Sequence, residues 1–170
     1  VSRENLIKAD VWAKIIWGDI GDPDLLAADL QSKYGIDLKQ LLNVRTFLDH
    51  NRIWEQPNSL SSPRTSKSTG AYAYKGKWLA NNLVSESLRS HFNKWEPYVE
   101  KYGLLLIELH TVKPELIAAN MGKTAATAYD LTHGYSDQYI IEIDEFMQIM
   151  AEVGLVADMG KHRRYPNSEL

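Results

Sequence analysis

The stretch Asn43-Val44-Arg45-Thr46-Phe47-Leu48-Asp49-His50 decides the fold of this 170-residue chain. The apolar run from Leu41 to Leu48 predicts a strand, and an acid and an imidazole follow directly after it. A second run, from Gly103 to Leu109, predicts another strand, with Glu108 and His110 near its end. Helical segments separate the predicted strands. Because parallel neighbours need such crossovers, we expect an α/β fold with a parallel, doubly wound sheet.

The remaining elements follow from apolar periodicity and from helix-capping residues. Ile15-Ile16-Trp17 predicts a short buried strand, because the glycines and the proline of residues 18–23 end it in a turn. Asp22 and Pro23 open a helix, with the acid as its N-cap. Apolar spacing predicts two further helices, over residues 82–102 and 144–153. Four tryptophans at apolar positions are expected in the core: Trp12, Trp17, Trp78 and Trp95.

Composition excludes several classes of protein. The formal charge of −3 and the lack of a Lys/Arg stripe argue against a nucleic-acid partner. Without cysteine there is no disulfide and no thiolate metal site, and no apolar stretch reaches the roughly 20 residues of a membrane span. We expect one cytoplasmic domain over residues 1–170. Its segment 57–70, rich in Ser, Pro, Thr and Lys, is expected to be a mobile surface loop and a candidate lid.

Polar side chains follow each predicted strand. In open α/β sheets, ligands bind beyond the carboxyl ends of the strands, so these groups are expected at one rim. They are Asp19, Asp22, Asp49, His50, Glu108 and His110. Asp22 reads as a helix cap, whereas Asp19 is either part of the turn or a contact to a nucleotide-like ligand. Asp49 and His50 can together hold a proton or a metal, and the alternative is that Asp49 caps the following segment with His50 bonded to it.

A second polar segment, Thr132-His133-Gly134-Tyr135-Ser136-Asp137-Gln138, packs several metal-binding side chains around a glycine bend. An imidazole with amide or carboxylate oxygens suits a divalent ion such as Fe(II) or Mn(II). A loop of this composition can equally be a solvated turn, and the spacing leaves both readings open.

These motifs resemble those of a known family. The segment Lys14 to Pro23 resembles the third strand and acidic turn of class I S-adenosylmethionine-dependent methyltransferases, with Leu41 to Asn51 as the fourth strand and Gly103 to Thr111 as the fifth. The runs 44–50, 106–111 and 128–139 together resemble the metal-dependent C-methyltransferase domains of polyketide synthase loading modules of the apratoxin-pathway type. The resemblance covers nearly the whole chain.

The resemblance implies metal-assisted methyl transfer from S-adenosylmethionine to a carbon of an acyl or malonyl-type substrate, small or carrier-bound, in polyketide biosynthesis. It implies that Asp19 and Ile20 contact the adenine and that Arg45 and Thr46 line the cofactor site. Asp49, His50 and His133 would be catalytic. The implied metal ligands are His133 and Gln138, with Asp49 or Asp130 as the third.

The sequence also departs from that family. It has no glycine-rich turn for the methionine part of the cofactor, and the first, second and last strands of the Rossmann-like sheet are missing from the predicted elements. We therefore expect a partial domain, inactive alone, that pairs with the remainder of its own enzyme or exchanges a strand in a homodimer. Two alternatives stay open: a non-catalytic methyltransferase-like binding or scaffolding module, and a metal-dependent acyl decarboxylase.

Overall fold

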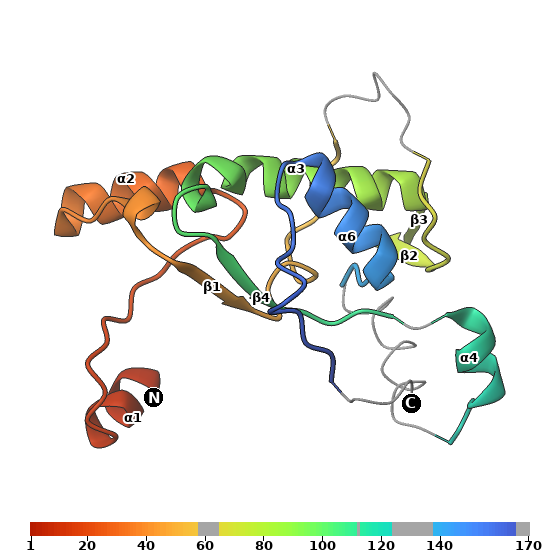
Figure 1. Cartoon of the computed structure of the whole chain (residues 1–170), viewed down its shortest axis with the longest axis horizontal. Coiled ribbons are helices and arrows are strands. Elements are labelled where there is room, and N and C mark those ends of the chain that lie inside the picture. The colour runs from red at the N-terminus through yellow and green to blue at the C-terminus, as the bar shows by residue number, and fades with distance from the viewer. Residues whose placement is uncertain (58–64, 112, 124–137, 166–170) are drawn as a thin grey trace.

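Two parallel strands beneath a layer of helices form the centre of the fold (Figure 1). The computed structural model describes residues 1–57, 65–111, 113–123 and 138–165. Strand β1 (Asn43–Thr46) pairs in parallel with β4 (Leu104–Ile107), and Thr46 lies opposite Ile107. Three helices lie over one face of this pair: α2 (Pro23–Tyr34), α3 (Asn81–Val99) and α6 (Ile143–Glu152). The predicted mixed α/β architecture with parallel strands is confirmed.

Helices α2, α3 and α6 begin close to the residues predicted, and α3 and α6 end within three residues of their predicted ends. The Asp22 carboxylate accepts a hydrogen bond from the Leu25 N–H, and Pro23 occupies the first turn, so α2 starts as the capping rule requires. Gly35, at φ +67°, ends α2 in the left-handed conformation that favours glycine. Helix α3 contains Pro97 in its last turn and ends at Val99, three residues before the predicted end.

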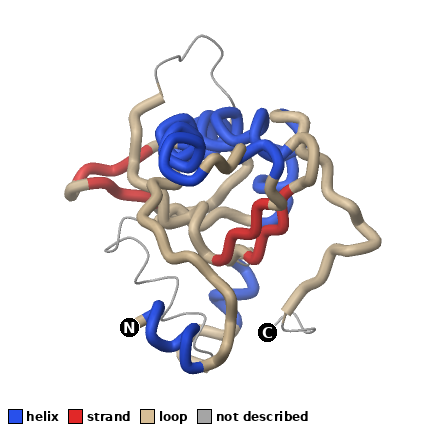
Figure 2. Tube along the Cα trace, turned by 90° about the vertical axis from the view of Figure 1, so that its left-hand side faces the viewer, coloured by secondary structure: helices blue, strands red, loops and turns tan. Residues whose placement is uncertain are grey.

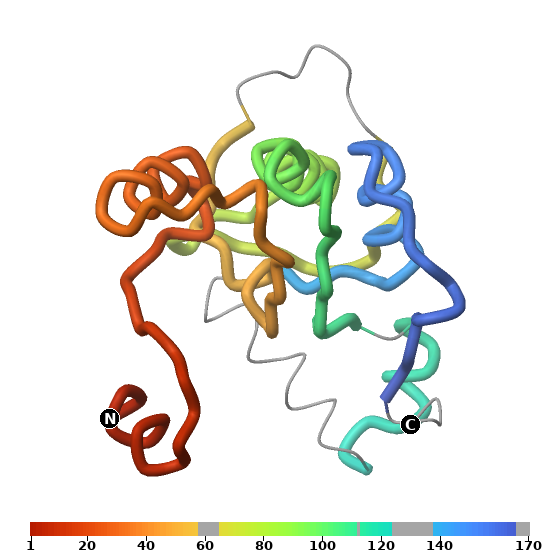
Figure 3. Tube along the Cα trace, turned by 60° about the vertical axis from the view of Figure 1, so that its left-hand side comes forward, coloured from red at the N-terminus to blue at the C-terminus, as the bar shows by residue number. Residues whose placement is uncertain are grey.

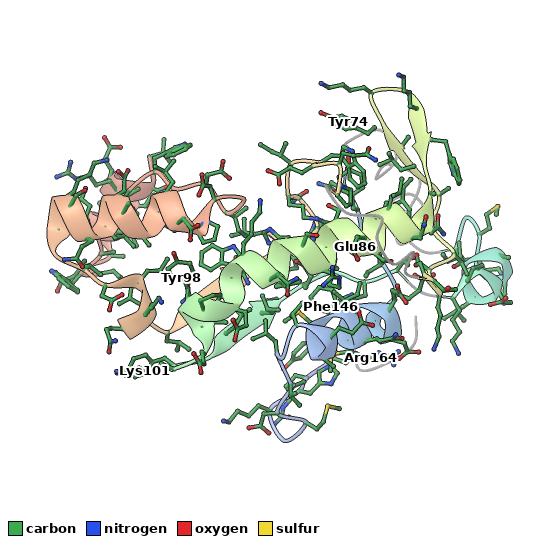
Figure 4. The ribbon with its side chains drawn as sticks, turned by 90° about the horizontal axis from the view of Figure 1, so that it is seen from above. Tyr74, Glu86, Tyr98, Lys101, Phe146 and Arg164 are labelled. Atoms are coloured by element: carbon green, nitrogen blue, oxygen red, sulfur yellow. The ribbon has the colours of Figure 1, made fainter. Side chains whose placement is uncertain are left out.

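Helix α3 is the centre of both apolar clusters, and seen from above it runs between α2 and α6 (Figure 4). Toward α6, Phe92 packs edge-to-face on Phe146 with ring centroids 5.6 Å apart. Toward α2, the Tyr98 hydroxyl donates to Asp24 Oδ1 at 2.5 Å, beside a cluster of buried side chains. That second cluster comprises Leu30, Leu38, Trp95 and Val99.

The smaller elements lie around this centre. Strands β2 (Tyr72–Tyr74) and β3 (Lys77–Leu79) form an antiparallel hairpin, visible apart from the parallel pair in Figure 2. Its turn residues Lys75 and Gly76 both have positive φ, as a tight two-residue hairpin requires. The other elements among the described residues are α1 (Ser2–Lys8), the 3₁₀ helix η1 (Leu38–Gln40) and α4 (Pro114–Ala119). An isolated parallel bridge joins Thr111 to Glu142.

The predicted strand at Ile15-Ile16-Trp17 is wrong. These residues are irregular and exposed, in a segment that runs away from the helices toward α1 (Figure 3). A strand needs a neighbour for its backbone hydrogen bonds, and no strand of the described residues lies beside this segment. Trp12 and Trp17 belong to this segment and are therefore exposed rather than in the core. Trp78, on the hairpin, is exposed as well, whereas Trp95 is buried as predicted.

The face of the β1–β4 pair opposite the helices carries exposed apolar side chains. The Arg45 side chain lies on the face of β1 that α3 covers. The side chains of Val44 and Thr46 lie on the opposite, exposed face, together with those of Leu105 and Ile107 of β4. The described sheet contains two strands, so the larger, incomplete Rossmann-like sheet stays a prediction.

The segment 57–70 divides into two parts. Residues 58–64 lie outside the described residues, so their predicted mobility and lid role remain predictions. Hydrogen bonds anchor the second part: the Lys67 N–H donates to Glu145 Oε2 at 3.2 Å, and the Thr69 N–H donates to Glu142 Oε1 at 2.8 Å. None of the helices described is both long and apolar enough to span a membrane.

Candidate active site

The carboxyl ends of β1 and β4 bring Glu108 against the turn that carries Asp49 and His50. Because the two strands are parallel and adjacent, the residues that follow them meet at one edge. Glu108 Oε2 accepts hydrogen bonds from the N–H groups of Asp49 and His50, at 3.0 and 3.3 Å, and Oε1 accepts one from the Leu109 N–H at 3.0 Å. Oε1 also pairs with His50 Nδ1, and both side chains are only 4% exposed.

The Glu108 carboxylate fixes the orientation and the tautomer of the His50 ring. A carboxylate only accepts hydrogen bonds, so Nδ1 of His50 carries the proton toward Glu108 and Nε2 of the neutral ring is the base. In the described part of the chain, no hydrogen bond engages Nε2. The three N–H groups hold Glu108 in place, so the pair has the arrangement of a base oriented by an acid.

A second imidazole, His110, lines the same small cavity as His50. The cavity has a volume of about 10 Å³, enough for about one water molecule. His110 Nδ1 lies 3.2 Å from the Ile141 carbonyl oxygen, and its ring packs against Phe146. Burial lowers the pKa of His110, partly offset by this hydrogen bond, and the neutral ring is therefore favoured near neutral pH.

Asp49 is turned toward α3 and is fully buried. Its Oδ1 lies 3.2 Å from Arg45 Nη1 and accepts a hydrogen bond from His91 Nε2 at 2.9 Å. Oδ2 is buried without a hydrogen-bond partner. Burial lowers the pKa of His91, with Asp49 opposing the effect. Although adjacent in sequence, Asp49 and His50 therefore serve different partners: Asp49 anchors the turn to α3, whereas His50 pairs with Glu108.

Two buried guanidinium groups surround this turn. Arg45 lies with its Cζ atom 4.6 Å from the Trp95 ring centroid and beside Phe92, and it is close enough to Asp49 to pair as an ion. None of its nitrogens makes a hydrogen bond, and burial lowers its pKa. Arg52 is better satisfied, because it donates to the Asp49 carbonyl at 3.0 Å and to the Val84 carbonyl at 3.2 Å. Burial lowers the pKa of Arg52 to about 10.

Asp19 lines a hollow of about 340 Å³ at the start of α2. Glu55 and Lys94 form its other side, with their charged atoms 2.8 Å apart. The Trp95 indole N–H donates to the Ile20 carbonyl at 2.8 Å, and the same ring stacks on Arg45. Trp95 thus connects the hollow to the buried turn through a single side chain.

The structure assembles part of the predicted site. Arg45, Asp49 and His50 lie together under α3. Asp19 lines the neighbouring hollow, whereas Ile20 is not among its lining residues and accepts a hydrogen bond from Trp95. Thr46 is separated from Arg45 because it faces the opposite, exposed side of β1. Gln138 is half-buried and precedes Tyr139, whose N–H donates to the His50 carbonyl at 2.9 Å. His133 and Asp130 lie outside the described residues.

The described residues do not fit a metal ion at Asp49. Among them, no cluster of three or more His, Cys, Asp or Glu side chains could hold one. The Asp49 carboxylate already lies beside a buried guanidinium, whose positive charge disfavours a second cation there. The predicted set of His133, Gln138 and Asp49 therefore stays a prediction, without support from the described geometry.

The sequence placed Glu108 and His110 at this rim without giving them a role, and His91 was not predicted at the site. Glu108 and His110 follow their strand at the expected rim, so the strand-end rule already indicated their position. His91 had a subtler signal: it is a titratable side chain within the buried stripe of α3, between Leu88 and Trp95.

Comparison with known proteins identifies a relationship over the full length of the chain. A family model described as the AprA MT2-like domain, a methyltransferase family, matches residues 1–170. A search of curated proteins found no match.

Proposed function

Because the chain belongs to the methyltransferase family described as the AprA MT2-like domain, we propose that it transfers a methyl group from S-adenosylmethionine to a carbon atom of an acyl substrate. The observation that carries the chemistry is the His50–Glu108 pair. Methylation of a carbon next to a carbonyl requires removal of a proton from that carbon. A buried imidazole held by a carboxylate is a suitable base for this step.

The pair performs proton abstraction as follows. His50 Nε2 takes the proton from the substrate carbon, and the electron pair of the broken C–H bond stays on the substrate as an enolate. The imidazolium that forms is stabilised by the Glu108 carboxylate, which the Asp49, His50 and Leu109 N–H groups keep in place. The enolate carbon would then form a bond to the methyl group that bound S-adenosylmethionine supplies. The bond between this methyl group and the sulfonium sulfur would break at the same time, and S-adenosylhomocysteine would leave as the neutral thioether.

The hollow at Asp19 is the candidate site for the adenosyl end of this cofactor. Its volume of about 340 Å³ is within the range of small-molecule sites, and a carboxylate can accept a hydrogen bond from the adenine amino group. Asp19 and Ile20 would hold the base, and Arg45 would support the wall of the site by packing behind Trp95, with its charge paired to Asp49. The proposed contact of Thr46 requires that the cofactor site reach the open face of β1.

The small cavity beside His50 favours a second candidate, a non-catalytic module that uses the methyltransferase fold for binding. In the described part of the chain, that cavity has room for about one water molecule and not for an acyl group. Catalysis therefore requires that the site open to admit the substrate. A binding module has no such requirement.

The test separates the two candidates. The protein is incubated with S-adenosylmethionine carrying a ¹³C-methyl group and with a malonyl-type thioester, and the product is analysed by mass spectrometry. We expect a labelled C-methyl product from the wild type, and a loss of roughly 100- to 10,000-fold in kcat for His50→Ala. The control, Lys8→Ala, changes an exposed residue of α1, outside the candidate site, and should retain activity. Cofactor binding without any product would favour the binding module, and decarboxylation without a methyl donor would identify an acyl decarboxylase.

A further inference from the structure

The turn that follows β1 begins with a strained residue. Phe47 has φ +55°, in the left-handed region that a bulky residue rarely adopts. Its N–H still belongs to the sheet, donating to the Ile107 carbonyl at 2.8 Å. The chain therefore leaves the strand abruptly at Phe47, and the surroundings must hold this conformation against its intrinsic cost.

This reversal allows two successive N–H groups to reach one oxygen atom. In an extended strand, consecutive N–H groups point to opposite sides, so neighbours cannot bind the same acceptor. After Phe47 the chain curls, and the N–H groups of Asp49 and His50 both donate to Glu108 Oε2. The backbone conformation of the turn thus determines where the Glu108 carboxylate lies, and with it the His50 ring.

Asn51 closes the turn. Its side-chain Nδ2 donates to the Phe47 carbonyl at 2.9 Å, and its backbone N–H donates to the Leu48 carbonyl at 3.1 Å. The side chain is exposed, so it adds little to the apolar core. The direction of the Phe47 carbonyl depends on the backbone angles of Phe47. The hydrogen bond from the Asn51 amide to this carbonyl therefore stabilises the positive φ of Phe47.

We propose that Asn51 is a positioning residue for the His50–Glu108 pair, acting as a clasp on the strained backbone of Phe47. The expected effect of Asn51 on the rate of methyl transfer rests on the proposed function. Its effect on the geometry of the His50–Glu108 pair does not. Loss of the amide would let the turn relax toward ordinary φ values. The two N–H groups would then no longer converge on Glu108, and the His50 ring would lose its fixed orientation.

The central experiment is Asn51→Ala, with two readouts. The first is the kinetics of methyl transfer, for which we expect kcat to fall about 10- to 100-fold with KM nearly unchanged, because misplacement of a base affects the chemical step. The second is the ¹H–¹⁵N NMR signal of the His50 Nδ1 proton, which we expect to weaken or shift as its bond to Glu108 loosens. Asn120→Ala is the matched control, since Asn120 Nδ2 also donates to a carbonyl four residues earlier, that of Leu116, and this bond lies on α4.

A rescue variant distinguishes positioning from general destabilisation. Glycine adopts positive φ without the steric cost, so Phe47→Gly together with Asn51→Ala should restore the His50 Nδ1 signal and most of the lost kcat. Asn51→Asp keeps the size and shape of the side chain but removes the N–H donor. It replaces Asn51→Ala in both measurements if the alanine variant folds poorly. The proposal is overturned if Asn51→Ala or Asn51→Asp keeps the wild-type Nδ1 signal, or if the double variant fails to recover it. Absence of methyl transfer in the wild type would refute the proposed function, while the NMR readout would still decide the role of Asn51.

Discussion

Replacement of Asp49 by alanine should destabilise the fold strongly, because it leaves the Arg45 guanidinium buried without a counter-charge. Asp49 is fully buried, and its Oδ1 serves both Arg45 at 3.2 Å and His91 at 2.9 Å. Arg45 is 5% exposed and makes no hydrogen bond, so among the described residues Asp49 is the main compensation of its charge, with a weaker contribution from Glu108. Removing one member of a buried ion pair costs about 3 to 5 kcal/mol.

The same reasoning predicts that removal of the Arg45 charge restores part of the stability that Asp49→Ala loses. Arg45→Met replaces the guanidinium by an apolar side chain of similar length that can pack against Trp95 and Phe92. Exchange of a buried ion pair for apolar groups is often neutral or stabilising. The double variant Arg45→Met with Asp49→Ala should therefore be more stable than Asp49→Ala alone by about 2 kcal/mol or more.

Urea unfolding followed by circular dichroism measures these effects. With a slope of roughly 2 kcal/mol per M of urea, Asp49→Ala should lower the unfolding midpoint by about 1.5 to 2.5 M. Asp49→Asn, which retains an acceptor for His91, should lie between the wild type and the alanine variant. A midpoint for Asp49→Ala within about 0.5 M of wild type would refute the argument, as would a double variant less stable than Asp49→Ala.

Three further perturbations test other parts of the structure by the same unfolding assay. Burial lowers the pKa of His91 and His110 below the ordinary 6.5, so the unfolded chain binds more protons than the folded chain as the pH falls. The free energy of unfolding should therefore decrease as the pH drops from 6.5 through the lowered pKa values. An unfolding midpoint that does not change between pH 5 and 7 would contradict this. Ile149→Ala, at a fully buried position of α6, should cost about 2 to 5 kcal/mol, and Ile149→Val about 1, whereas equal losses would argue against close packing there. Gly35→Ala should cost about 1 to 2 kcal/mol through its φ of +67° alone, because no atom lies within 4 Å of the added Cβ; an unchanged midpoint would mean that α2 ends differently.

Local signals in the sequence predicted α2, α3, α6 and the two parallel strands correctly, whereas α1 and α4 were not predicted. Asp22 and Pro23 set the start of α2 whatever surrounds them, because capping satisfies backbone groups within the same turn. The run 103–109 predicted β4 because it contains four consecutive apolar residues, Leu104 to Ile107. The run 41–48 predicted β1 because apolar and β-branched residues predominate in it, although Asn43 and Arg45 interrupt it. The hairpin β2–β3 was missed, although the alternating residues around Lys75 and Gly76 carry a recognisable turn signal.

The candidate site could be predicted only in part. The strand-end rule placed Asp49, His50 and Glu108 at one edge, since parallel neighbouring strands end side by side. It could not distinguish the roles of the two acids. The adjacent pair Asp49 and His50 suggested a direct partnership, yet the carboxylate that holds His50 comes from 58 residues later in the chain. The directions of the Asp49 and His50 side chains depend on the strained turn at Phe47. No pattern of residue types in the sequence predicts that turn.

The amino-acid sequence by itself determined the family, the capped start of α2, the apolar stripes of α3 and α6, the two β segments and the residues available for acid–base chemistry, because each of these depends on neighbours along the chain. The tertiary structure alone decided that Asp49 binds Arg45 and His91 while Glu108 receives His50. It also decided that residues 15–17 do not form a strand. The physical reason is shared: strand pairing and buried ion pairs join groups that are remote in sequence, and their free energy depends on the partners and the burial that the assembled fold provides.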